Sequence, residues 1–259
     1  PRGARENLAL AFASALGTVF WFSAVQGTVW FAAHVVGFAL TSAYVLFSLD
    51  ARSPALAGLC LGLAFATRAP LIFLAPLFLG ELCAGFRRRI AAGDERRAAG
   101  REALVALARF ALPVLVVGAA LAWHNHARFD DAFEFGHRHL AVVWRPRIER
   151  WGLFSLHYLG RNLGVMLAST PFFGGTGAPL SISGHGLALW ITSPFLFVAL
   201  WPRRLGGAAR ASYLSLGAAA LAVVIPALLY QNTGWLQFGY RFSNDFAPLL
   251  VAMLAIGRR

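Results

Sequence analysis

The sequence predicts an all-α, polytopic transmembrane bundle, and composition and segment length both indicate this class. Of the 259 residues, 58% are hydrophobic and only 13% are charged, whereas soluble domains contain about 25% charged residues. Several apolar runs approach the roughly 20 residues that an α-helix needs to cross a bilayer. These runs are longer than the alternating segments of about ten residues that build an outer-membrane barrel. We therefore expect a multi-pass helical membrane protein.

The first elements along the chain are two apolar runs, which cover about residues 8–24 and 29–49. Each run is close to the length of one membrane-spanning helix. The short turn at residues 25–28 separates them. Charged residues and Pro54 then interrupt the apolar pattern, because proline removes a backbone donor and cannot continue a helix interior.

Arg68 lies in the next apolar stretch, where a charged side chain is costly and indicates a function or a specific partner. The runs on either side, residues 55–66 and 71–83, are each too short to span at about 1.5 Å per residue. Two arrangements are open: one long kinked helix, or a hairpin of two short helices with residues 67–70 at its tip. Pro70 favours a break. The positive-inside rule also favours the hairpin, with Arg68 near the outer face.

The second half of the chain alternates polar segments with apolar runs. An arginine-rich segment at residues 86–102 is expected to be a cytoplasmic loop. The expected spans that follow are residues 103–123, 187–201, 213–230 and 246–256. The two segments expected outside the membrane are residues 124–184 and 231–245. Within the longer outer segment, residues 151–173 are apolar around a few polar residues and are expected to form an interfacial helix.

All 23 basic residues are arginines, and the formal net charge is +12. A strongly basic chain can indicate nucleic-acid binding. Here the arginines fall mainly between apolar runs, where positive charge orients a membrane protein. We therefore expect membrane lipids as partners and no nucleic acid. Cys60 and Cys83 lie in apolar segments, so we expect small buried hydrophobes and no disulfide.

The chain is expected to be a single transmembrane domain over residues 1–259 and the C-terminal part of a longer protein. It begins with Pro1 and not with methionine. The residues before the first apolar run do not have the pattern of a cleavable signal peptide.

Three segments carry a family resemblance. Residues 58–68 follow the pattern Gly-x-x-x-Gly-Leu-Ala-x-x-Thr-Arg/Lys. Residues 128–136 contain Arg-Phe and then Phe-Glu-Phe-Gly, after a span that ends in Trp and Asn. Residues 237–248 read Gln-Phe-Gly-Tyr-Arg-Phe-Ser-Asn-Asp-Phe-Ala-Pro. Together the segments resemble bacterial integral-membrane glycosyltransferases of the GT-C superfamily, nearest to the protein-mannosyltransferase-like and aminoarabinose-transferase-like families. The resemblance covers most of the chain.

The resemblance implies transfer of a sugar from a polyprenyl-phosphate donor to an acceptor on the outer face of a bacterial inner membrane. Arg68 would bind the donor phosphate, because its guanidinium is a planar fork that is always charged. The alternative for Arg68 is a structural arginine that snorkels or binds carbonyls. Arg241 would assist, or would instead pair with Asp245 four residues later. The other substrate-lining candidates are Arg128, Tyr240 and Gln237.

The resemblance also implies a catalytic base, an Asp or Glu in the first outer loop of the family. The early turn at residues 25–28 contains no acid, so the base is expected upstream of Pro1 and the fragment is expected to be inactive alone. Asp130, Asp131 and Glu134 are weak substitutes, since a carboxylate can take the proton of an acceptor hydroxyl. Their alternative role is helix capping or pairing with nearby arginines.

Two histidine pairs, His124 with His126 and His137 with His139, offer possible ligands for a divalent metal. Alternate spacing suits a strand, and neither a cysteine nor a close acid completes a motif. No cofactor is therefore expected, and a divalent metal is the weaker alternative. Two other functional classes stay open: a transporter or lipid flippase with Arg68 as an in-membrane substrate contact, and a non-catalytic membrane scaffold.

Overall fold

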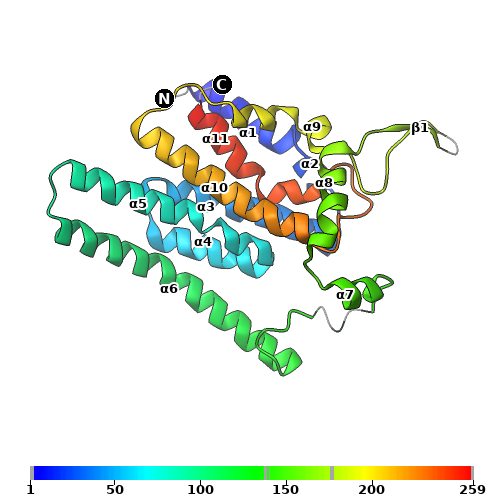
Figure 1. The fold of residues 1–259 in the computed structure, drawn as a ribbon, viewed down its shortest axis with the longest axis horizontal. Helices are drawn as coiled ribbons and strands as arrows, with labels where there is room; N and C mark the ends of the chain where they lie inside the picture. Colours follow the sequence, from blue (N-terminus) through cyan, green and yellow to red (C-terminus); the bar gives the residue numbers. More distant parts are fainter. Residues whose placement is uncertain (1–2, 137–138, 140, 176–177, 258–259) are drawn as a thin grey trace.

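The computed structural model describes residues 3–136, 139, 141–175 and 178–257 (Figure 1). It confirms the predicted all-α class. The α-helices are α1 (Ala4–Leu16), α2 (Phe20–Ala24), α3 (Val29–Ser48), α4 (Pro54–Thr67), α5 (Pro76–Ala91), α6 (Arg96–Phe129), α7 (Arg145–Trp151), α8 (Leu159–Ala168), α9 (Leu189–Thr192), α10 (Gly207–Leu229) and α11 (Ala247–Gly257). Short 3-10 helices are η1 (Leu49–Ala51), η2 (Ala69–Leu74), η4 (Leu156–Tyr158), η5 (Pro194–Leu200) and η6 (Arg241–Asp245). The strands β1 (Phe172–Gly175) and β2 (Ala178–Ser181) pair antiparallel.

Within the described residues, four helical segments are long and apolar enough to cross a membrane. They are Val29–Ala51, Ala69–Ala91, Arg96–Phe129 and Gly207–Leu229. The helix α6 presents large apolar side chains on its exposed face, such as Leu112 and Leu115 at 64% and 67% exposure. An apolar surface of this extent suits contact with lipid and not with water. Length, composition and exposed surface therefore all indicate a membrane protein.

The chain reverses direction at Arg68. This residue has an extended backbone, with φ −149° and ψ 114°, between α4 and η2. Just before α4, the Asp50 N–H donates to Glu81 Oε2 of α5 at 2.9 Å, and the Asp50 carboxylate accepts from Arg88 at 2.9 Å. The start of α4 thus lies beside the later part of α5, and the two helices run in opposite directions (Figure 1). The reversal at residues 67–70 is confirmed, and a single kinked helix is excluded. The expectation that the arm after it is too short to span is wrong, because that arm is Ala69–Ala91.

Close packing of small residues holds the central helices together. A Cβ at Gly58 of α4 would lie 2.0 Å from the Phe110 carbonyl oxygen of α6. The Phe110 ring stacks on Phe78 of α5, with centroids 4.1 Å apart. A Cβ at Gly80 of α5 would lie 2.2 Å from the Ser215 Oγ of α10. Glycine therefore permits the close approach of α4 to α6 and of α5 to α10, as is common where membrane helices pack.

Two predicted spans differ from the structure because local side chains and proline break them. The apolar run at residues 8–24 divides into α1 and α2, since the Thr18 hydroxyl donates to Ser14 O at 2.7 Å and accepts from the Phe20 N–H. The prediction of a span at residues 187–201 is wrong. There α9 ends before Ser193, which has φ −150° and ψ 55°, and Pro194 disfavours helix at that residue. The segment continues as the 3-10 helix η5.

Two other predicted elements also need correction. The expected loop at residues 86–102 is mostly the end of α5 and the start of α6, because Arg89 pairs with both Asp94 and Glu102 and stabilises the turn. The expected interfacial helix at residues 151–173 is interrupted at Gly152, which has φ +76°. Only α8 within it is a regular helix of ten residues. Cys60 and Cys83 are both free; Cys60 is buried as expected, whereas Cys83 is exposed.

The bundle has two distinct ends (Figure 1). The site end holds residues 25–28, 68–70 and 231–245, which the Arg68–Asp245 and Ser23–Asn244 contacts join. The same end carries α7, α8 and the β1–β2 hairpin in the right half of Figure 1. The opposite end holds the connections at residues 49–53, 92–95 and 201–206. Residues far apart in sequence therefore converge at the site end.

Candidate functional site

Arg68 and Asp245 form a bidentate ion pair at the site end. Arg68 Nε donates to Oδ1 at 2.8 Å, and Nη2 donates to Oδ2 at 2.9 Å. The side chain of Asp245 is 1% exposed and that of Arg68 is 14% exposed. The pair uses two of the five N–H donors that a guanidinium carries. Arg68 thus has the specific partner that a charged residue between apolar segments requires.

Local sequence places both members of the pair where helices are interrupted. Arg68 lies between α4 and η2, and Pro70 prevents α4 from continuing through it. Asp245 is the last residue of η6, and only Phe246 separates it from the start of α11. Both residues therefore lie at breaks between helices. At such breaks the backbone changes direction, and a polar side chain can point away from the lipid-facing surface.

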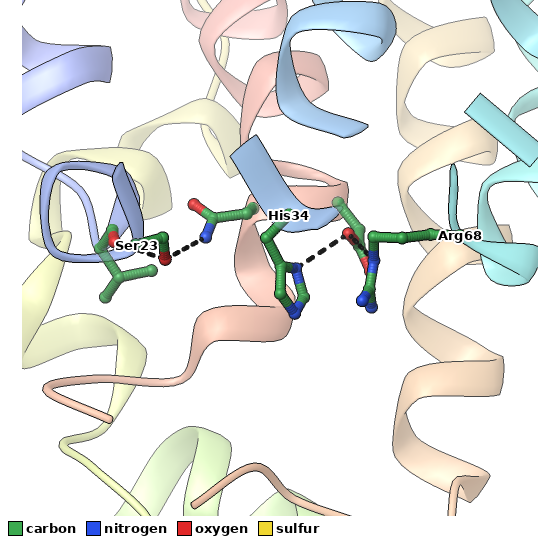
Figure 2. Close-up of polar contacts among 6 residues, drawn as sticks. Ser23, His34 and Arg68 are labelled. Atoms are coloured by element: carbon green, nitrogen blue, oxygen red, sulfur yellow. Dashed lines mark hydrogen bonds and ion pairs between the residues drawn. The ribbon is translucent and has the colours of Figure 1, made fainter. Parts of the chain in front are cut away.

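His34 of α3 completes the contacts of this carboxylate. Its Nδ1 lies 3.3 Å from Oδ1 of Asp245, within ion-pair distance but without the geometry of a hydrogen bond. On the far side of the histidine, the amide of Asn244 donates to Ser23 Oγ of α2 at 2.9 Å. Figure 2 shows His34 between Ser23 and Arg68. The network joins α2, α3, η6 and the break after α4.

Arg241 is the second buried guanidinium at the site end. It is 9% exposed, and Nη1 makes one long hydrogen bond, 3.4 Å, to Trp235 O. Its guanidinium carbon lies 4.8 Å from the ring centroid of Phe31 and 5.7 Å from that of Phe242. Among the described residues, Nε has no hydrogen-bond partner and no carboxylate lies within ion-pair distance. The alternative in which Arg241 pairs with Asp245 is therefore wrong, because Arg68 occupies that carboxylate.

The site carries more positive than negative charge. Burial alone would raise the pKa of Asp245, but Arg68 and the His34 contact outweigh it and lower that pKa to about 2. Burial and repulsion from Arg68 lower the pKa of Arg241 to about 10. At neutral pH the carboxylate is thus ionised and Arg241 remains protonated. The Arg68–Asp245 pair and Arg241 together carry a net positive charge, so the site favours an additional anion.

Two other predicted residues come from the loop before η6. Tyr240 is fully buried, its ring lies 5.6 Å from that of Phe242, and its hydroxyl has no partner in the described chain. Since Phe242 also lies 5.5 Å from the Arg68 guanidinium, Tyr240 belongs to the surroundings of the site. Gln237 instead fixes the loop, because its Nε2 donates to His185 O at 2.7 Å and to Thr233 O at 2.9 Å.

The predicted residues after α6 serve the end of that helix. Arg128 is exposed, with its guanidinium 4.9 Å from the ring centroid of Phe129. Asp130 ends α6 in the left-handed conformation, φ +55°, which aspartate tolerates better than most residues. Asp131 Oδ1 accepts from the N–H of Phe133 at 2.9 Å, a typical side-chain turn. Glu134 is 8% exposed. The structure thus supports the capping role for Asp130 and Asp131.

Metal ligation has little support from the residue types brought together. Within the described part of the chain, no group of three or more His, Cys, Asp or Glu side chains could hold an ion. His124 and His126 are exposed on α6, and His139 stacks on Phe129 with centroids 5.0 Å apart. His137 lies outside the described residues.

An apolar groove of about 430 Å³ runs along α1, α3 and α11. Its lining includes Leu10, Phe38, Val45, Pro248 and Val251. Phe38 lies one helical turn after His34, and Pro248 three residues after Asp245, so the groove begins about one turn from the charged network. A lipid chain could lie in the groove while its headgroup reaches the site end.

Sequence reasoning identified Arg68 and Arg241 but not the parts played by His34 and Asp245. Asp245 could have been predicted as a partner of Arg68, because opposite charges near membrane segments tend to pair. Glu81 was missed for the same reason: it is fully buried in α5 and accepts the N–H of Asp50.

Comparison with protein-family models, with curated proteins and with solved structures finds no significant match. The resemblance to GT-C glycosyltransferases therefore rests on the three sequence segments alone.

Proposed function

We propose that the chain forms the donor-binding part of a membrane glycosyltransferase that uses a polyprenyl-phosphate-linked sugar. The observation that carries this proposal is the presence of two largely buried guanidiniums at the site end: Arg68 binds Asp245, and Arg241 has no carboxylate within ion-pair distance among the described residues. An uncompensated buried charge is costly. The phosphate of the donor would supply the missing negative charge and accept charge-assisted hydrogen bonds.

The arrangement suits the charge that develops during sugar transfer. When the bond between the anomeric carbon and the phosphate oxygen breaks, the departing polyprenyl phosphate gains negative charge. Donors that are already oriented stabilise such charge most effectively. Asp245 holds Arg68 through Nε and Nη2, which leaves Nη1 for the phosphate. Arg241 offers its unpartnered Nε.

The apolar groove along α1, α3 and α11 supports a lipid-linked donor. A polyprenyl chain needs an apolar surface that begins at headgroup depth. The groove starts about one turn below His34 and Asp245 and continues toward Val45, within the span Val29–Ala51. The phosphate would then lie at the site end, and the chain would lie against α3 and α11.

The distribution of arginine supports an orientation with the site end outside a bacterial inner membrane. Arginines cluster in the helix ends at the opposite end of the bundle: Arg87, Arg88, Arg89, Arg96, Arg97 and Arg101. Short arginine-rich segments are retained on the cytoplasmic side. The donor site would consequently open to the outer face, where polyprenyl-phosphate sugars are used.

The test is the variant Arg241→Gln in the full-length protein, assayed for sugar transfer at several donor concentrations. Loss of a charged hydrogen-bonding partner is worth about 1.5–3 kcal/mol, so we expect kcat/KM for the donor to fall about 10- to 100-fold. The control is Arg203→Gln, which removes one exposed arginine at the opposite end. A well-folded Arg241→Gln protein whose donor kcat/KM matches that of the control would refute a phosphate role.

A further inference from the structure

A second pair of arginines converges at the site end, on a residue that follows α10. Arg147 of α7 donates through Nη2 to the side-chain oxygen of Gln231 at 2.9 Å. Arg161 of α8 donates through Nη2 to the backbone oxygen of the same residue. One neutral glutamine therefore receives hydrogen bonds from two guanidiniums, which brings two positive charges close together.

Neighbouring groups hold both guanidiniums in place. The Tyr158 hydroxyl donates toward Arg147 O and Gly152 O, at 3.2 and 2.9 Å, and fixes the backbone of α7. The Arg161 guanidinium lies 5.4 Å from the centroid of the same Tyr158 ring. Beside it, Asn162 Nδ2 donates to the carbonyls at the end of α10: Ala227, Leu228 and Tyr230. The two arginines are thus oriented without any ligand.

The pair lacks a compensating anion. Nε of Arg147 and Nε of Arg161 are both buried without a hydrogen-bond partner in the described chain. Burial and repulsion from Arg147 lower the pKa of Arg161. Within the described residues neither arginine has an ion pair; the nearby Glu149 pairs with Arg145 instead. The negative end of the α10 dipole stabilises the positive charge of Arg161. It does not compensate the charge of Arg147.

The surface around this pair suits the headgroup region of a membrane. Large apolar side chains near α7 and η4 are exposed: Trp144, Trp151, Phe154 and Leu156. Tryptophan at the level of the headgroups is typical of membrane proteins. An anion at this level would carry phosphate, either as part of a phospholipid headgroup or as a free phosphorylated molecule.

We propose that Arg147 and Arg161 form a second phosphate-binding site, separate from the Arg68–Arg241 site. Tyr230 and Gln231 lie between the two: the Tyr230 ring is 6.2 Å from Phe242 of the first site, and Gln231 binds the arginines of the second. The ligand is a phosphate monoester, or the phosphodiester of a headgroup with net negative charge, whose oxygens accept hydrogen bonds from both guanidiniums. This site does not depend on the proposed transferase activity.

The test measures phosphate binding by the full chain in nanodiscs, through tryptophan fluorescence during thermal unfolding. One arm titrates inorganic phosphate in phosphatidylcholine discs, with chloride at equal ionic strength as reference. The other arm replaces phosphatidylcholine stepwise with phosphatidylglycerol. Arg147→Gln should weaken the apparent affinity at least tenfold, which corresponds to about 1.4 kcal/mol. Arg150→Gln, an exposed arginine of the same helix, should change it less than twofold.

The outcomes separate the two sources of phosphate. A saturable response to inorganic phosphate supports a free phosphorylated ligand, and a response to phosphatidylglycerol alone supports a headgroup. The inference fails if chloride gives the same response, or if the Arg147→Gln and Arg150→Gln proteins respond equally. It also fails if Arg241→Gln abolishes the response while Arg147→Gln retains it, because the anion would then occupy the first site. Arg147→Lys should retain part of the affinity for phosphate, since it keeps the positive charge but loses the planar guanidinium and its several N–H donors.

Discussion

The variant Asp245→Asn should destabilise the bundle, because it removes the carboxylate that pairs with Arg68. In the native protein the pair makes two hydrogen bonds of 2.8 and 2.9 Å, and Asp245 is 1% exposed. Breaking a buried pair from one side typically costs about 3–5 kcal/mol. Arg68 is 14% exposed and can rehydrate in part, so we expect a loss near the lower value, about 3 kcal/mol.

The assay is equilibrium unfolding in detergent, with a matched control and a double variant. Asp50→Asn removes an exposed carboxylate that also pairs with an arginine, Arg88, and should cost less than about 1 kcal/mol. Combining Asp245→Asn with Arg68→Gln should cost less than the sum of the two single variants, because the second change removes the charge that the first leaves unpaired. A loss below about 1 kcal/mol for Asp245→Asn, or strict additivity in the double variant, would refute the coupling inferred here.

Two further predictions concern helix packing and pH. Gly58→Ala should lower the unfolding temperature, since the new Cβ would lie 2.0 Å from the Phe110 carbonyl oxygen and α4 must move away from α6. Gly100→Ala in α6, where the Cβ meets open space, should not lower it, because alanine favours a helix more than glycine does. The pKa of Asp245 is lowered to about 2, below the roughly 3.9 of an unfolded aspartate. Its contribution to stability is therefore fully present above pH 4 and lost as the pH falls toward 2. Acid unfolding of the wild type should show this loss between pH 4 and 2, and Asp245→Asn should not.

Local sequence patterns were sufficient for the membrane class and for most of the helices. Helices α3 and α10 follow directly from apolar runs of spanning length. The break at Arg68 follows from Pro70, which acts on its neighbouring residues through sterics and a missing N–H. Local rules were less successful at residues 187–201, where hydropathy predicted one helix and Pro194 divides the segment.

The pairing of the charged residues was decided only by the tertiary structure. Sequence spacing offered Asp245 a partner four residues away, Arg241, yet the carboxylate binds Arg68, 177 residues earlier in the chain. The contacts of Arg147 and Arg161 with Gln231 span 84 and 70 residues. Hydropathy and helix periodicity describe a segment and its immediate neighbours. Which charges meet depends on how the helices pack and where their ends converge, and that arrangement is a property of the whole bundle.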